Sequence, residues 1–174
     1  KPGLERDAAE PGSELDFVRY TAFASYVQSL PLGLRFVAAA RAGAIDRLLD
    51  TEVIPIQERF FNGGEYTIRS FLEDEAGPKV NGEPIGGETF TTINVELRFP
   101  LVFLEGLQGA AFFDTGTITE RLEDFGGGRY FSGAGAGIRY STPVGPFRFD
   151  MAWNPDRERG EDFFAFHFGV GYPF

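Results

Sequence analysis

The strongest constraint on the fold of this chain is a strict alternation of large apolar and small or polar residues in seven segments. They span residues 15–29, 33–45, 88–99, 106–116, 131–142, 146–154 and 163–172. In the last segment one face carries Phe164, Phe166, Phe168, Val170 and Tyr172. A period of two residues indicates β-strands and not helices, because successive strand side chains point to opposite faces.

Two environments fit strands with one apolar and one charged face. In a soluble β-sandwich the apolar faces meet a second sheet, and in a membrane β-barrel they meet lipid. Almost every strand here has the same large apolar face, and no segment is predicted to form a covering helix. We therefore expect an all-β, antiparallel transmembrane β-barrel, with a soluble β-sandwich binding module as the alternative.

Composition supports this fold and excludes several functions. Aromatic residues make up 16% of the 174 residues, with 20 Phe and 23 Gly, as expected for a lipid-facing wall around a crowded lumen. The net charge of −10 argues against nucleic acid binding, which needs clustered cations. Without cysteine, neither disulfides nor thiolate metal sites can form. No apolar run approaches the ~18–20 residues of a membrane helix. The first residues lack the apolar core of a signal peptide, so the true N-terminus is expected upstream.

The connections between the strands alternate between short and long. Residues 30–33, 100–105 and 142–146 are short, whereas 46–87, 117–130 and 155–162 are long. Outer-membrane barrels have short periplasmic turns and long external loops. The pattern therefore predicts a periplasmic C-terminus and an extracellular loop 46–87. It also predicts that residues 1–14 are the end of an extracellular loop, and that residues 15–174 are barrel.

An odd number of strands raises a closure problem. If seven antiparallel strands closed on themselves, the first and last would run parallel, which bacterial single-chain barrels generally avoid. An open edge would leave backbone groups unpaired in hydrocarbon. We therefore expect this chain to be the C-terminal part of a larger barrel or one piece of a multi-chain barrel.

Two motifs lie where such a barrel would place them. The long loop contains Phe60-Phe61-Asn62-Gly63-Gly64 and, four residues later, Ile68-Arg69-Ser70-Phe71. A strand end contains Phe112-Phe113-Asp114-Thr115-Gly116. A third block runs from Gly135-Ala136-Gly137-Ile138-Arg139 to Pro146-Phe147-Arg148-Phe149-Asp150. In order and spacing these motifs resemble those of the BamA/TamA family of outer-membrane insertases and translocases. Ser70 departs from the usual glycine, which would make a positive φ there less comfortable.

The resemblance implies a sixteen-stranded barrel, of which this chain supplies about seven C-terminal strands, with the long loop folded into the lumen. The loop motif comprises Phe61, Gly63, Gly64, Ile68, Arg69 and Phe71. The inner-wall motif comprises Phe112, Asp114 and Gly116. In the family the loop arginine reaches carboxylates of the wall, so Arg69 is expected to clamp Asp114, as a planar guanidinium can do bidentately. Outside the motif context, Arg69 would be a solvated loop charge and Asp114 a turn former.

Five further charges point inward by strand parity. They are expected to form a structural ladder with the tucked loop, and a conducting pore lined by them is the alternative. These residues are Glu96, Arg98, Arg139, Arg148 and Asp150.

The last strand carries its own expected role. A C-terminal aromatic on an alternating strand resembles the signal that assembly machinery reads, and the family's last strand pairs weakly with the first to form a lateral seam. Strand glycines weaken pairing, which suits such a seam. The residues concerned are Phe168, Gly169, Gly171, Tyr172 and Phe174.

Catalysis is poorly supported, and the chain is not expected to be an enzyme or to need a cofactor. The single histidine, His167, has no cysteine or evident serine partner and is interpreted as structural. The acidic run 73–75 lacks calcium-loop spacing and is interpreted as solvated. The glycines at 133, 135 and 137 precede no helix that could receive a phosphate.

The expected function is therefore insertion of outer-membrane proteins, or polypeptide translocation, in a bacterial outer membrane. Expected partners are the lipid bilayer, unfolded client polypeptides, the missing barrel strands and accessory assembly subunits. A passive channel or secretion pore on the same barrel is the alternative.

Overall fold

The structure, a computed structural model, describes residues 3–8, 16–49, 51, 53–102, 104–143, 145–155, 157 and 162–171, with the backbone alone for 3–8. No helix in these ranges is long and apolar enough to cross a membrane. The helical turns are the 3₁₀ segments η1 (Pro31–Gly33), η2 (Ile56–Glu58) and η3 (Leu122–Asp124).

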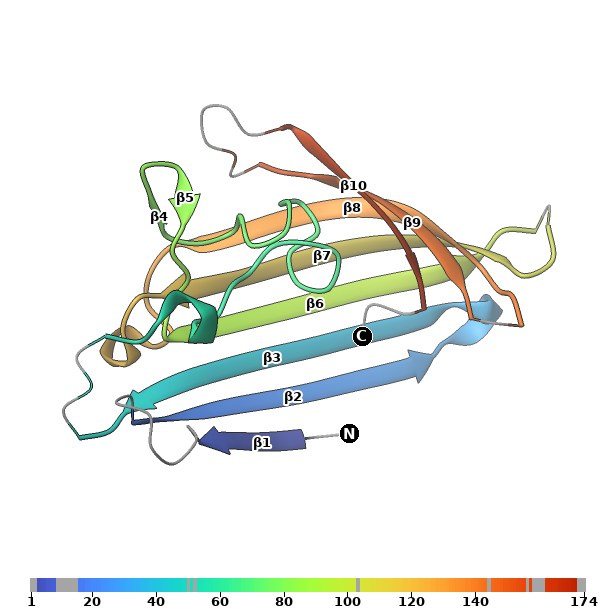
Figure 1. Cartoon of the computed structure of the whole chain (residues 1–174). Coiled ribbons are helices and arrows are strands. Elements are labelled where there is room, and N and C mark those ends of the chain that lie inside the picture. The colour runs from blue at the N-terminus through green and yellow to red at the C-terminus, as the bar shows by residue number, and fades with distance from the viewer. Residues whose placement is uncertain are drawn as a thin grey trace.

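A single antiparallel sheet of eight strands dominates the molecule, and its order is β1-β2-β3-β6-β7-β8-β9-β10 (Figure 1). All seven strands expected from alternation are present, with ends shifted by at most a few residues. The strands are β1 (Gly3–Ala8), β2 (Phe17–Ser29), β3 (Arg35–Arg47), β6 (Thr89–Pro100), β7 (Leu107–Thr119), β8 (Tyr130–Tyr140), β9 (Phe147–Trp153) and β10 (Phe164–Val170).

Strand β1 corrects the expectation that residues 1–14 end a loop, since residues 3–8 pair with β2 from Gly3↔Phe23 to Ala8↔Val18. Charges and glycine gave this segment little strand propensity, but the free edge of β2 offers partners for its backbone N–H and C=O groups. With eight antiparallel strands, β1 and β10 run in opposite directions. The expectation that the first and last strands would run parallel, which rested on an odd number of strands, is therefore wrong. The two strands lie at opposite edges of the sheet, and no pairing joins them within the described ranges.

The long connection from β3 to β6 folds back over the sheet. It contains a small hairpin of β4 (Lys79–Val80) and β5 (Glu83–Pro84). Asn81 and Gly82 form its turn, with φ of 54° and 88°, the left-handed pair that a type I′ turn requires. Between β3 and this hairpin the chain passes across the face of β6, β7 and β8 (Figure 1).

The two faces of the sheet have inverted polarity relative to a soluble domain. The covered face holds buried charged side chains, whereas the other exposes large apolar residues. Exposed examples are Ile93, Phe113, Ile138, Phe149, Met151, Trp153, Phe166 and Phe168. Water would penalise such a surface, but lipid does not. In the described part of the chain no second sheet packs on the apolar face, as the soluble sandwich would require.

Two small apolar clusters anchor the first part and the middle of the loop to the covered face. One contains Phe17, Ile45, Ile54 and Phe60. The other contains Ile68, Phe71, Ala76 and Phe131, where the rings of Phe71 and Phe131 meet edge to face with centroids 5.5 Å apart. Between these clusters the contacts between loop and wall are polar.

Candidate functional site

The loop motif begins with a sharp turn that only glycine fits. Gly63 has φ of 113°, and a Cβ there would lie 2.3 Å from the carbonyl oxygen of Leu72. Gly64 has φ of 94°, and its N–H donates to the carbonyl oxygen of Phe71 at 3.1 Å. The Thr67 hydroxyl donates to the carbonyl oxygen of Gly63 at 2.7 Å. This closed turn directs the following residues toward the wall.

Arg69 and Asp114, which the resemblance places in contact, form a bidentate ion pair. Nε of Arg69 lies 2.8 Å from Oδ2 of Asp114, and Nη2 lies 2.9 Å from Oδ1. The Arg69 backbone N–H also donates to Oδ2, at 3.1 Å. Both side chains are fully buried. The guanidinium carbon lies 3.5 Å from the ring centroid of Phe112, a cation–π contact on the same strand as Asp114.

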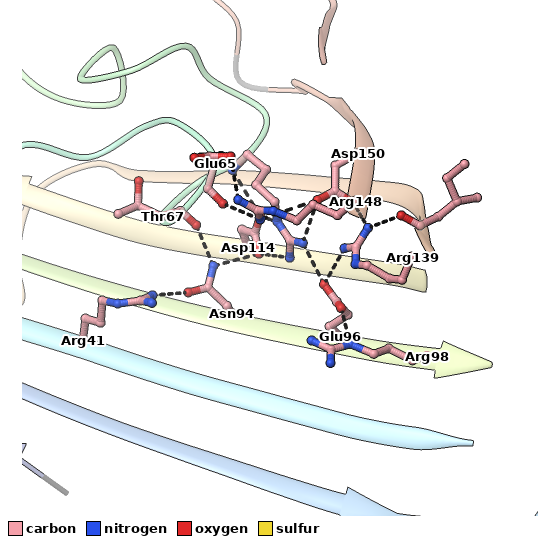
Figure 2. A network of polar contacts seen from close by, with 12 residues as sticks. Arg41, Glu65, Thr67, Asn94, Glu96, Arg98, Asp114, Arg139, Arg148 and Asp150 are labelled. Atoms are coloured by element: carbon pink, nitrogen blue, oxygen red, sulfur yellow. Dashed lines mark hydrogen bonds and ion pairs between the residues drawn. The ribbon is translucent and has the colours of Figure 1, made fainter. Parts of the chain in front are cut away.

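Glu96 joins three arginines. Its Oε2 accepts from Nη1 of Arg69 at 2.7 Å and from Nη2 of Arg139 at 3.1 Å, while Oε1 accepts from Nε of Arg98 at 2.6 Å (Figure 2). These residues come from the loop, β6 and β8. One carboxylate therefore holds three structural elements together.

Asp150 extends the network to β9. Its Oδ1 lies 2.6 Å from Nη1 of Arg139, and its Oδ2 lies 3.6 Å from Nη1 of Arg69 and 3.9 Å from Nη1 of Arg148. The five inward charges expected from parity, on β6, β8 and β9, thus lie in one connected network (Figure 2), which the loop arginine joins through its ion pairs with Glu96 and Asp150.

Opposing effects act on the pKa of Arg69. Burial alone would lower it, but hydrogen bonds and charge attraction from Asp114, with a further contribution from Glu96, outweigh burial and raise the pKa of Arg69. The guanidinium therefore stays charged, and a buried charge of this kind is stable only while its partners remain.

Residues that sequence reasoning missed complete the loop contacts. The Thr92 hydroxyl donates to Oδ1 of Asn62 at 2.7 Å. Asn94 donates from Nδ2 to the Thr67 carbonyl oxygen at 2.6 Å and to Oδ1 of Asp114 at 2.8 Å. Asn94 shares the inward parity of Glu96, and Asn62 lies inside the loop motif, so the sequence could have indicated that both side chains face the contact between loop and wall.

The remaining apolar residues of the loop motif are buried or partly buried. Ile68 is fully buried and Phe71 nearly so, while Phe61 is partly buried. Ser70, where the resemblance led us to consider a strained backbone, is absent from the residues with positive φ, and its hydroxyl donates to the carbonyl oxygen of Ser132 at 3.3 Å.

Inner-wall glycines leave the space that the loop fills. A Cβ on Gly116 would lie 3.2 Å from both Nδ2 of Asn62 and Cδ1 of Ile68 in the loop, and one on Gly135 would lie 2.3 Å from the ring of Phe112, which contacts Arg69. On Gly133 it would lie 2.0 Å from Oγ and 2.2 Å from Cβ of Ser70.

Replacing Gly133 with alanine is therefore expected to lift the loop from β8. The added methyl meets the Ser70 Cβ, which cannot rotate away, so we expect a loss of about 1–3 kcal/mol of stability. The measurement is the temperature at which the complete protein loses its folded gel mobility. Gly77→Ala is the matched control, because its new methyl meets only the tip of Ile118 at 3.3 Å. Equal effects of both changes would contradict this fit.

The expected seam residues on β10 lie on different faces. Phe168 points outward and is 70% exposed, while Gly169 faces the loop, where a Cβ would lie 2.8 Å from Oε2 of Glu65. Gly171 has φ of 99°. Tyr172 and Phe174 lie outside the described residues.

Among the described residues no three His, Asp or Glu side chains lie close enough together to hold a metal ion, and the acidic run 73–75 makes other contacts. Glu75 instead pairs with Lys79, with Oε2 and Nζ 2.6 Å apart. Burial, then the charges of Asp74 and Glu65, raise the pKa of Glu73, whereas His167 opposes that rise.

A sheet with a lipid-compatible outer face and a charged inner face, filled by an inward loop, is the wall of a transmembrane β-barrel. Comparisons with known proteins support this class. The Omp85 superfamily domain matches residues 4–174. The chain therefore belongs to the Omp85 superfamily, which includes BamA.

Relatives come from bacteria and from eukaryotes. A SAM50-like protein of Drosophila melanogaster is 29% identical over 175 residues, covering 90% of this chain and 37% of that protein. The outer membrane protein assembly factor BamA of Neisseria meningitidis is 26% identical over 206 residues, covering 99% of this chain and 26% of that protein. The crystal structure of BamA from Haemophilus ducreyi lacking POTRA domains 1–3 has the same fold, with a TM-score of 0.77 at 18% identity, over 95% of this chain and 37% of that one. The chain thus spans well under half of each.

Proposed function

We propose that this chain is the C-terminal part of an outer-membrane barrel that assists the insertion of other barrel proteins without chemical catalysis. Membership of the Omp85 superfamily and the likeness to proteins named outer membrane assembly factors support this proposal. The eight strands would supply half of the sixteen that the family resemblance implies.

The observation that carries the proposal is the clamp between the loop and the inner wall. Arg69, Glu96 and Asp114 are fully buried, so the loop fills the space beside β6, β7 and β8. A passive channel would need that space as a water-filled path, with its charges hydrated. The buried clamp therefore favours insertion over a channel or secretion pore.

In this proposal the lateral seam lies at the β10 edge. Phe168, with Tyr172 and Phe174 beyond the described residues, would form the aromatic strand signal, and Gly169 and Gly171 would weaken its pairing. Client strands would add to the exposed edge through backbone hydrogen bonds. The partners are thus the bilayer, unfolded client polypeptides, the remaining strands and accessory subunits.

We place the protein in a bacterial outer membrane, because a bacterial relative matches across 99% of the chain. The superfamily also reaches organelles, since outer envelope protein 80 of Arabidopsis thaliana, a chloroplast protein, is 31% identical over 122 residues, covering 66% of this chain and 15% of that protein. Fractionation of the native cell envelope tests this placement.

The decisive experiment reconstitutes the complete protein into lipid vesicles and supplies a urea-unfolded outer-membrane barrel as client. The proposal predicts faster appearance of folded, protease-resistant client in the membrane than with empty vesicles. Client recovered inside the vesicle lumen would identify translocation instead. Steady ion conductance with no effect on client folding would overturn the proposal in favour of a pore.

A further inference from the structure

The loop also contacts the last described hairpin, β9–β10, through polar groups that the clamp does not use. His167 projects inward from β10, and its Nε2 lies 2.8 Å from the carbonyl oxygen of Arg69. A carbonyl can only accept, so Nε2 carries the proton and donates. Arg69 thus contacts Asp114 on the wall through its side chain and His167 on the last described strand through its backbone carbonyl.

A second contact joins β9 to the loop. Nη2 of Arg148 lies 2.6 Å from Oε2 of Glu65, and Nη1 donates to the Glu65 carbonyl oxygen at 3.3 Å. The Arg148 guanidinium also lies 5.1 Å from the ring centroid of Tyr66. Gly169 makes this approach possible, because a Cβ there would lie 2.8 Å from Oε2 of Glu65 and 2.9 Å from Nε of Arg148.

Neither apolar cluster on the covered face includes a residue of this hairpin. A cavity of about 200 Å³ separates them, lined by Ser70, Phe71 and Leu72 of the loop and by Asn154, Phe164 and Ala165 of the hairpin. In the sheet β10 pairs with β9, and the described strands give it no partner on the other side. Polar contacts connect the hairpin to the loop: Arg148 and Asp150 contribute them from β9, and His167 contributes one from β10.

We propose that His167 is a positioning residue that couples β10 to the Arg69 clamp. Movement of β10 away from the wall breaks its hydrogen bond to Arg69, and release of Arg69 from Asp114 removes the acceptor that holds β10. Because coupling free energies are reciprocal, each event makes the other easier by the same factor. The coupling itself is argued from these contacts. Its use, the opening of a seam at β10 when a client enters, rests on the proposed function.

Hydrogen exchange on the complete protein in vesicles tests the coupling without any client. His167→Leu removes the donor, and His167→Gln retains an N–H at similar reach. Loss of one net hydrogen bond of about 1 kcal/mol predicts about fivefold faster exchange in residues 164–170 and 65–71 for the leucine variant, with β2 and β3 unchanged. The glutamine variant should return to within about twofold of the wild type.

Two further variants complete the design. Asp114→Asn, which loosens the clamp from the other side, should also speed exchange in β10. Phe166→Leu, on the lipid-facing side of the same strand, should leave loop exchange unchanged. The proposal is overturned if His167→Leu changes β10 alone, or if glutamine behaves like leucine. Failure of client insertion with these exchange changes intact would instead reject the proposed function and leave the coupling standing.

Discussion

Replacing Arg69 with alanine is expected to release the loop from the barrel wall and to remove most of the insertion activity. The change leaves Asp114 without its bidentate partner and weakens the balance of charge at Glu96, both fully buried. Breaking a buried ion pair by removing one partner typically costs about 3–5 kcal/mol. The measurements are the thermal midpoint of folded gel mobility and the rate of client insertion by the complete protein.

Two variants calibrate this loss. Arg47 pairs with Glu88 near the end of β3, with side chains 33% and 5% exposed; Arg47→Ala takes this partner from one buried carboxylate, whereas Arg69→Ala takes a partner from both Asp114 and Glu96, so Arg47→Ala should cost less. Arg69→Lys keeps the charge but cannot contact Asp114 bidentately and Glu96 at once, so an intermediate loss is expected. An Arg69→Ala variant no weaker than Arg47→Ala would contradict the clamp.

The second large effect is expected from Glu96→Gln. The neutral amide removes the charge that balances Arg69, Arg98 and Arg139, and its NH₂ group brings a donor toward groups that can only donate. Three buried guanidiniums are then left with too little negative charge, and a loss of about 3–5 kcal/mol follows. Urea unfolding of the complete protein in detergent measures this loss.

Glu88→Gln is the matched control for that substitution. It makes the same chemical change, but its partner Arg47 can turn toward water. We expect a small shift of the midpoint for Glu88→Gln and a large one for Glu96→Gln. Equal shifts would mean that Glu96 is not the junction of the network.

Most of the fold could be predicted from the alternation of apolar and polar residues, because a lipid-facing wall repeats one apolar face along every strand. It predicted the ends of seven strands, β2, β3 and β6 to β10, to within a few residues. It could not find β1, whose pairing comes from the free edge of β2 and not from its own sequence. The hairpin of β4 and β5 was not predicted for another reason. Two-residue strands are too short to show a period, although Asn81-Gly82 is a turn signal.

The site was predictable in part. The resemblance pointed to Arg69 and Asp114, and parity pointed to the charges on β6, β8 and β9. The contacts of Glu65 with Arg148 and of Arg69 with His167 depend on the path of a long loop across the sheet. Neither parity nor spacing specifies that path, since it is fixed by glycine clearance and side-chain contacts between distant segments.

The central claim, that a clamped loop makes this barrel competent for insertion, is tested most directly by a double-mutant cycle on the client insertion rate. The four proteins are wild type, Arg69→Ala, Asp114→Ala and the double variant, each complete and in identical vesicles. We predict that the double variant loses no more than the more severe single variant, because each removes the same interaction. Losses that add would show that the two residues act independently and would contradict the account.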